Sequence, residues 1–225
     1  MTFISGGPSR FLYFDVHLGR PQWPSLRVLD FGGNAGNLLL DSRCTIDQRN
    51  YSCLDVSRDG VALGRRRYPD ARFVFYNRFH PFFNPEGDDD LPIPLPGPFD
   101  VILAYSVLTH LSIEETGKLW KELLALLLPG GALAFTFMDP RYRPAPRTWT
   151  NLEDRLHRAG GPDPSDFDVV AVNDGELADA DRYPPRAAQY DVLHSRDFVQ
   201  RMFPEAVIRP PLFGERQHCA ILRAL

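Results

Sequence analysis

Two acids and a group of glycines stand at positions where a chain can bind a nucleotide. Asp30 ends a short apolar segment, and the glycines that follow it are Gly32, Gly33 and Gly36. Glycine accepts positive φ values and lets a ligand approach the main chain without a Cβ in the way. A helix that starts directly after such a turn presents free N–H groups to the ligand. Residues 28–40 are therefore predicted to form a strand, a binding turn and a helix.

The second acid, Asp55, ends the apolar segment 51–55. A carboxylate accepts hydrogen bonds from both hydroxyl groups of a ribose, whereas it repels a phosphate. The alternative is that Asp55 caps the helix that begins near Ser57. The dinucleotide spacing Gly-x-Gly-x-x-Gly is absent from the first turn, which weakens the interpretation as a nicotinamide enzyme.

The first turn resembles motif I of class I S-adenosylmethionine-dependent methyltransferases. In that motif an acid at a strand end is followed by glycines at alternate positions, here Asp30, Gly32 and Gly36. Asn34 replaces the middle glycine, and Asn is one of the few residues that tolerate a left-handed backbone. The segment 99–111 is similar to the fourth-strand motif of the same family. Pro129-Gly130-Gly131 resembles the turn before its fifth strand.

The resemblance implies an α/β, Rossmann-like fold with a seven-stranded, mostly parallel sheet, helices on both faces and an antiparallel last strand. It covers residues 26–139 and 195–225, which would form the core of a single methyltransferase domain, 1–225. Residues 140–194 would then be an insertion on the substrate side, a lid after the fifth strand. Residues 1–25 would form an N-terminal cap.

The resemblance also implies S-adenosylmethionine as the cofactor and S-adenosylhomocysteine as the product. Asn77 and Arg78 follow the third strand, where the family recognises adenine, and Tyr105 and Ser106 end the fourth strand, which faces the methyl group. The full set of expected cofactor-binding residues is Asp30, Gly32, Gly33, Asn34, Gly36, Asp55, Val56, Asn77, Arg78, Tyr105 and Ser106.

Transfer of an activated sulfonium methyl group needs mainly alignment and a dry site. An acceptor that carries a proton also needs a base, for which His110, His194 and Asp139 are candidates. For His110 the alternative is a role in anchoring the following helix. The residues expected to contact the substrate are Tyr13, His17, Tyr142, Trp149 and Tyr190. For the two on the first helix, plain aromatic packing is the alternative.

Periodicity and turn signals give the elements that would position these residues. The expected helices span residues 11–18, 37–40, 60–68, 112–128, 151–158 and 195–203. The expected strands after the second are 72–76, the fourth-strand segment within 99–111, 131–137, 167–172, 189–193, 205–209 and 217–225. Residues 167–172 and 189–193 would pair as an antiparallel hairpin, and the last two strands would form a hairpin that ends the sheet. The proline-rich segment 80–98 reads as a long loop without periodicity.

Composition limits the partners. A net charge of −4 and a pI near 5.9 disfavour nucleic acid as the principal partner. The most apolar stretch, 123–137, is interrupted by a proline and two glycines, which argues against a membrane span. The cysteines, Cys44, Cys53 and Cys219, lack metal-binding spacing and suit a reducing cytoplasm. A cytoplasmic protein without a bound metal is expected, and nothing indicates its oligomeric state.

Three functions remain open from the sequence. The first is a methyltransferase that acts on an O, N, C or S atom of a small molecule, which the order of the motifs favours. The second is a protein methyltransferase, for which we would expect an open groove at the carboxyl edge of the sheet. The third is a non-enzymatic module that binds S-adenosylmethionine or a partner protein.

Overall fold

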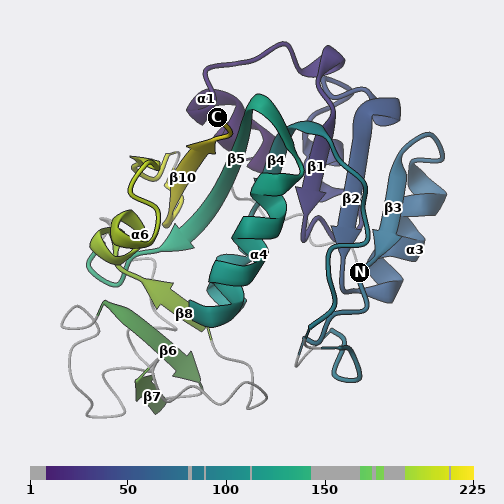
Figure 1. Cartoon of the computed structure of the whole chain (residues 1–225). Helices are drawn as coiled ribbons and strands as arrows, with labels where there is room; N and C mark the ends of the chain where they lie inside the picture. Colours follow the sequence, from purple (N-terminus) through teal and green to yellow (C-terminus); the bar gives the residue numbers. More distant parts are fainter. Residues whose placement is uncertain are drawn as a thin grey trace.

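The computed structural model describes residues 9–80, 83–88, 90–111, 113–142, 168–173, 176–179, 191–212 and 214–225. Its main sheet has seven strands in the order β3-β2-β1-β4-β5-β10-β9 (Figure 1). The strands are β1 (Val28–Phe31), β2 (Tyr51–Asp55), β3 (Arg72–Phe75), β4 (Phe99–Ala104), β5 (Leu127–Met138), β9 (Val207–Arg209) and β10 (Gln217–Arg223).

Strand directions follow the predicted pattern. Strands β1 to β5 pair in parallel, and β10 is antiparallel to both of its neighbours, β5 and β9. The predicted fold class, with its antiparallel last strand, is confirmed. β9 and β10 pair antiparallel at this end of the sheet, which confirms the predicted hairpin. β10 inserts between β5 and β9, so that β9 is the edge strand.

The helices form a layer on each face of the sheet. They are α1 (Arg10–His17), α2 (Asn37–Asp41), α3 (Arg58–Arg67), α4 (Ile113–Ala125) and α6 (Arg196–Met202). One hydrophobic cluster joins the sheet to α4 and α6, and another joins it to α1, α2 and α3. β1 and β2 are buried throughout, as is usual for parallel strands covered by helices on both sides.

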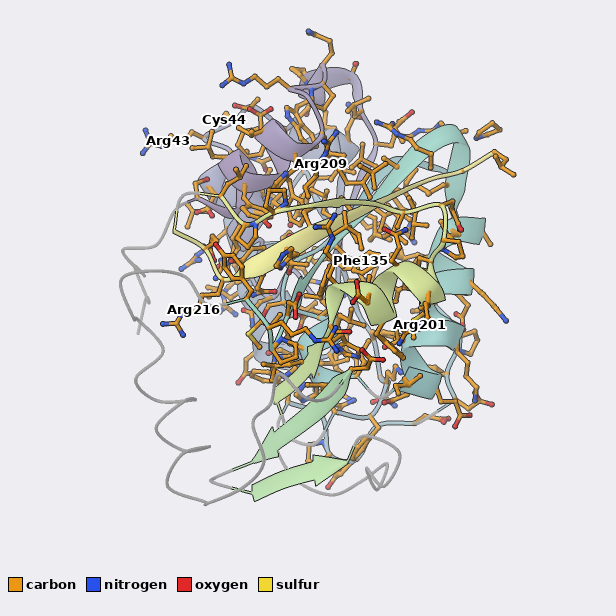
Figure 2. All side chains as sticks on the ribbon, turned by 90° about the vertical axis from the view of Figure 1, so that its left-hand side faces the viewer. Arg43, Cys44, Phe135, Arg201, Arg209 and Arg216 are labelled. Carbon is orange, nitrogen blue, oxygen red and sulfur yellow. The ribbon has the colours of Figure 1, made fainter. Side chains whose placement is uncertain are left out.

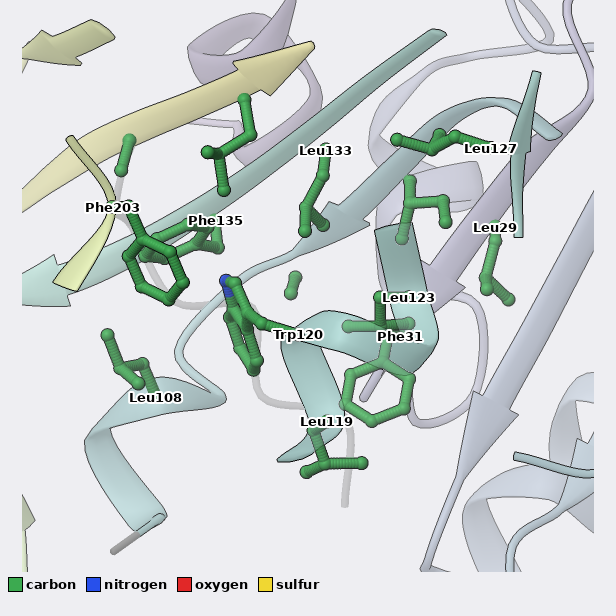
Figure 3. Packing of buried hydrophobic residues seen from close by; sticks show 14 of the residues in the cluster. Leu29, Phe31, Leu108, Leu119, Trp120, Leu123, Leu127, Leu133, Phe135 and Phe203 are labelled. Atoms are coloured by element: carbon green, nitrogen blue, oxygen red, sulfur yellow. The ribbon is translucent and has the colours of Figure 1, made fainter. Parts of the chain in front are cut away.

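Aromatic side chains fill the layer beneath α4 and α6 (Figure 3). Trp120 of α4 meets Phe135 of β5 edge to face with ring centroids 4.9 Å apart, and Phe203 meets Phe135 at 5.5 Å. Such contacts add to the free energy gained from burial alone. Figure 2 shows Phe135 in the interior beside α6, whereas Arg43 and Cys44 lie at the periphery of the molecule.

The helix predicted over 112–128 is too long at its carboxyl end. α4 ends at Ala125, and β5 begins at Leu127, before the predicted start at residue 131. Leu127 pairs with Phe99 of β4, and the Phe99 N–H donates to the Leu126 carbonyl at 2.8 Å. The neighbouring strand therefore draws these leucines into the sheet against their helical propensity.

A second, smaller sheet lies beyond the carboxyl ends of the parallel strands (Figure 1). It contains β6 (Val169–Asn173), β7 (Glu176–Asp179) and β8 (Asp191–His194) in the order β7-β6-β8. β6 pairs antiparallel with β8, which confirms the predicted antiparallel pairing of these two segments. β7 pairs with the other edge of β6 and was not predicted. The helix expected over 151–158 lies outside the described residues.

Candidate active site

The turn after β1 adopts the conformation that its residue types predict. Gly32, Asn34 and Gly36 have φ values of +77°, +53° and +76°. Asn34, which stands where motif I has its middle glycine, therefore adopts a left-handed backbone conformation. The Gly32 N–H donates to the Leu54 carbonyl at 2.8 Å, which ties the turn to the end of β2.

Asp30 lies underneath this turn. Its carboxylate is 2% exposed and accepts a hydrogen bond from the Tyr51 hydroxyl at 2.5 Å. A Cβ on Gly33 would lie 2.3 Å from Asp30 Oδ2, so only glycine lets the turn close over the carboxylate. Burial raises the pKa of Asp30 to about 7. Asp30 supports the turn from below, and it is not among the residues that line the cavity described next.

A cavity of about 170 Å³ opens beside the turn. Its lining brings together the turn, the end of β2, the segment after β3 and the segment after β4. The lining residues are Phe31, Gly32, Asn34, Leu54, Asp55, Val56, Tyr76, Arg78, Phe79, His80, Phe83, Ser106, Val107, His110, Leu111 and Leu119. Apolar side chains predominate, with a few polar groups between them, which is the usual make-up of a small-molecule site.

Asp55 connects the turn to this cavity. Its Oδ2 accepts the Asn34 N–H at 2.7 Å, and its Oδ1 accepts the Ser57 N–H at 2.7 Å. Burial raises the pKa of Asp55, and these two N–H donors oppose that shift. The cap of α3 is Ser57, whose hydroxyl accepts the Gly60 N–H at 3.1 Å. Each carboxylate oxygen of Asp55 keeps further acceptor capacity for a ligand in the cavity.

The segment after β3 forms a compact loop that the sequence did not reveal. Asn84 is buried, and its Nδ2 donates to the Arg78 carbonyl at 2.8 Å and to Asn77 Oδ1 at 3.2 Å. His80 and Asn84 exchange two main-chain hydrogen bonds of 3.0 Å. The loop brings Phe83 to the cavity, together with His80. An asparagine that folds back on its own loop was the available signal.

Of the residue pair expected to contact adenine, one lines the cavity. Arg78 is 5% exposed and its Nη2 lies 3.7 Å from Glu115 Oε1. Asn77 is exposed and does not belong to the lining. Of the two residues expected at the end of the fourth strand, Ser106 lines the cavity and Tyr105 does not. Tyr105 packs between α1 and β4, with its ring centroid 6.3 Å from that of Tyr13.

The three candidate bases occupy different environments. His110 lines the cavity, with its ring 5.9 Å from that of His80. His194 is 1% exposed, and burial lowers its pKa to about 4. Asp139 accepts the Arg141 N–H at 2.8 Å and the Arg196 N–H at 3.3 Å. In the described part of the chain, His194 and Asp139 are not among the lining residues of the cavity.

The expected substrate residues on α1 are close together. The rings of Tyr13 and His17 are 4.4 Å apart, and the Tyr13 hydroxyl donates to the Gln217 carbonyl at 2.5 Å. Burial lowers the pKa of His17 to about 4, and the charge of Arg209 adds to this shift. Tyr142 follows β5, and its ring lies 5.2 Å from that of His218. Trp149 and Tyr190 lie outside the described residues.

Asp168, directly before β6, links the smaller sheet to the core. It accepts hydrogen bonds from the Ser195 hydroxyl at 2.8 Å and Arg141 Nη2 at 3.1 Å, and it also pairs with Arg201. Arg141 Nη1 lies 3.1 Å from Asp197 Oδ2. Arg141 thus pairs with two carboxylates.

Two further findings bear on the site. Within the described ranges, no group of three or more histidine, cysteine, aspartate or glutamate residues is arranged to hold a metal ion. Among the helices that the structure describes, none is both long enough and apolar enough to cross a membrane.

Comparison with solved structures identifies the same architecture in other proteins. A glycopeptide N-methyltransferase, MtfA, complexed with sinefungin is 15% identical, with a TM-score of 0.59 and coverage of 99% of this chain and 95% of that one. The PH0226 protein of Pyrococcus horikoshii OT3 is 14% identical, with a TM-score of 0.59 and coverage of 96% and 90%.

CalS10, an amino pentose methyltransferase from Micromonospora echinaspora solved with S-adenosylmethionine bound, is 15% identical, with a TM-score of 0.57 and coverage of 98% and 93%. At these identities the likeness concerns the fold. The sequence adds a match to the methyltransferase domain family over residues 29–133, the region that contains the binding turn, Asp55 and the end of β4. The match over residues 29–133 and the shared fold together support a class I S-adenosylmethionine-dependent methyltransferase.

Proposed function

We propose that this chain binds S-adenosylmethionine in the cavity beside the glycine turn and transfers its methyl group to a small molecule. One observation carries the proposal. The same cavity is lined by the turn, by Asp55 at the end of β2 and by Ser106 and Val107 after β4. The glycine turn and the segment after β4 carry two motifs that resemble the family's, and Asp55 is the acid expected to meet the ribose.

The lining fits an uncharged purine nucleoside. Asp55 supplies acceptors for the ribose hydroxyl groups, and Val56, Val107 and Leu111 supply apolar surface for a flat base. A phosphate group would meet the Asp55 carboxylate and be repelled. The cavity is smaller than the roughly 300–1,000 Å³ of sites that enclose a whole drug-sized ligand. It would therefore hold the nucleoside, with the methionine portion over the glycine turn.

The cofactor supplies a methyl group that its sulfonium already activates. The protein has to hold that group in line with the acceptor atom and keep water away. Apolar residues of the cavity lining, among them Phe31, Val107 and Leu111, would help to keep water away. For an acceptor that carries a proton, His110 is the candidate base that lines the cavity, and a neutral imidazole nitrogen would take the proton.

Small-molecule acceptors are favoured by two observations. The β6-β7-β8 sheet lies beyond the carboxyl edge, on the side where open α/β sheets bind their ligands. CalS10 is described as an amino pentose methyltransferase and MtfA as a glycopeptide N-methyltransferase. A small acceptor of similar polarity would suit a site enclosed from that side.

Calorimetric titration with S-adenosylmethionine and S-adenosylhomocysteine tests the cofactor part of the proposal. We expect the wild-type chain to bind both, and Asp55→Ala to lose at least tenfold in affinity, because its carboxylate holds the turn and faces the ribose. Asp47→Ala is the matched control, since Asp47 caps a short turn and pairs with Arg49 away from the cavity. Absence of binding by the wild type would contradict the proposal.

A further inference from the structure

Ser106 holds an unusual backbone conformation at the wall of the cavity. It lies two residues beyond the end of β4 and has a φ of +59°, in the left-handed region that non-glycine residues rarely occupy. This conformation costs free energy, so the surrounding structure has to enforce it. The turn directs Val107 onto the glycine turn, where a Cβ on Gly32 would lie 2.6 Å from Val107 Cγ2.

A closed ring of hydrogen bonds surrounds Ser106. The Ser106 N–H donates to Thr136 Oγ1 at 2.8 Å, and the Thr136 hydroxyl donates to Gln217 Oε1 at 2.5 Å. Gln217 Nε2 then donates back to Ser106 Oγ at 3.1 Å. The ring joins the end of β4 to β5 and β10, three neighbouring strands of the sheet.

In each hydrogen bond of the ring, only one assignment of donor and acceptor is possible. Thr136 Oγ1 accepts from a main-chain N–H, so its single proton goes to the Gln217 amide oxygen, and the amide nitrogen is left to donate to Ser106. The Ser106 hydroxyl then donates a hydrogen bond to Thr109 Oγ1 at 3.3 Å, and the Thr109 hydroxyl donates to the Ser106 carbonyl at 3.1 Å. A network satisfied in this way has one arrangement, which makes it a rigid support.

Burial makes the ring costly to break. Thr136 is 0% exposed and Gln217 is 8% exposed, so loss of one member leaves the others unpaired and away from water. Gln217 also connects the ring to α1, because its main-chain carbonyl accepts the Tyr13 hydroxyl. Neither Thr136 nor Gln217 lines the cavity, and both act through Ser106.

We propose that Thr136 and Gln217 are positioning residues for the cofactor. Their ring with Ser106 holds this residue in the left-handed conformation and so sets the cavity wall where Ser106 and Val107 meet Gly32. The inference rests on the proposed function, since it concerns the same cavity. It adds two residues on strands β5 and β10 that do not line the cavity.

Substitutions of Thr136 separate the hydroxyl group from the rest of the side chain. Thr136→Val keeps the volume and removes both hydrogen bonds, whereas Thr136→Ser keeps the hydroxyl. We expect the dissociation constant for S-adenosylhomocysteine, measured by calorimetry on the full chain, to rise at least tenfold in Thr136→Val. In Thr136→Ser it should stay within about threefold of the wild type, because the ring still closes.

Gln217→Leu breaks the same ring from β10. If Thr136→Val does not fold, the affinity of Gln217→Leu for S-adenosylhomocysteine tests the proposal. The double variant should bind about as weakly as the weaker single variant, because members of one network are not additive. Thr116→Val serves as the stability control. It removes a buried hydroxyl of α4 outside the cavity lining, and should lower the unfolding midpoint without changing the dissociation constant.

Each result has a distinct meaning. Wild-type affinity in folded Thr136→Val or Gln217→Leu would overturn the inference and leave the proposed function intact. So would a Thr136→Ser variant as weak as Thr136→Val, because the hydroxyl would then not be the cause. A wild-type chain that binds neither S-adenosylmethionine nor S-adenosylhomocysteine would overturn the proposed function and this inference with it.

Discussion

Asp30 lies in the glycine-turn motif without lining the cavity beside it. Its carboxylate is enclosed by Tyr51, Cys53 and the main chain of Gly33, so the turn rests on it. The sequence predicted Asp30 as a cofactor-binding residue, but its side chain is buried away from the cavity against Tyr51, which enters from the adjacent strand.

The raised pKa of Asp30 leads to a prediction at this scale. The folded chain holds the proton up to a pH of about 7, against an ordinary value of 3.8, so the folded state binds more protons than the unfolded state between these limits. The free energy of unfolding should therefore fall as the pH rises from about 4 to about 7, by on the order of 4 kcal/mol from this group, and stay level above that range.

Asp30→Asn removes this contribution, because the amide does not titrate. The variant's free energy of unfolding minus that of the wild type should increase between pH 4 and pH 7 and then become constant. Urea unfolding at a series of pH values measures this difference. A difference that does not vary with pH would show that Asp30 is ionised in the folded chain.

At the scale of elements, helix caps and strand pairings decide where each segment ends. Ser195 caps α6, and its hydroxyl both accepts the Phe198 N–H at 3.1 Å and donates to Asp168 at 2.8 Å. The cap thus joins the core helix to the segment that leads into β6. The surrounding Arg141 and Arg201 pairs are partly exposed and stabilise the fold little, as is usual for surface ion pairs.

Ser195→Ala should lower the free energy of unfolding by about 1–2 kcal/mol, because it leaves one helix N–H and a carboxylate oxygen without this partner. Ser9→Ala is the comparison, since Ser9 caps α1 from a more exposed position through the Leu12 N–H alone. Its effect should be the smaller of the two in chemical unfolding. Equal effects would mean that the bond to Asp168 contributes nothing.

At the scale of the whole molecule, a bound cofactor should stabilise the chain. The ends of β1, β2 and β4 meet residues 78–80 and Phe83 at one cavity, so a ligand there would contact segments distant in sequence. A ligand that binds only the folded state adds about 2.7 kcal/mol at a concentration of 100 times its dissociation constant.

For a chain of this length such a gain corresponds to a rise of about 5–10 °C in the thermal midpoint. Differential scanning fluorimetry with S-adenosylhomocysteine should record this shift, and NADH at the same concentration should give none. A shift with NADH alone would support a nicotinamide site. A shift with neither ligand would argue against a nucleoside in this cavity.

Local patterns in the sequence determined the strand, turn and helix around Asp30 and the left-handed backbone of Asn34. They also determined that Asp55 ends a strand and that a serine caps α6. Each depends on residues a few positions apart, whose preferences the local backbone expresses directly. The mostly parallel sheet with an antiparallel last strand came from the family resemblance, and the structure confirms it. The single-domain division of residues 1–225 and the roles of the candidate bases remain predictions.

The tertiary structure alone decided which side chains meet. It placed Asp30 under the turn, brought His80 and Phe83 to the cavity through Asn84, and closed the ring between Thr136 and Gln217. It also drew Leu127 into β5 and set β7 beside β6. Such contacts join residues from separate elements. Burial, strand pairing and hydrogen bonds between elements override the local propensity that a sequence pattern reports.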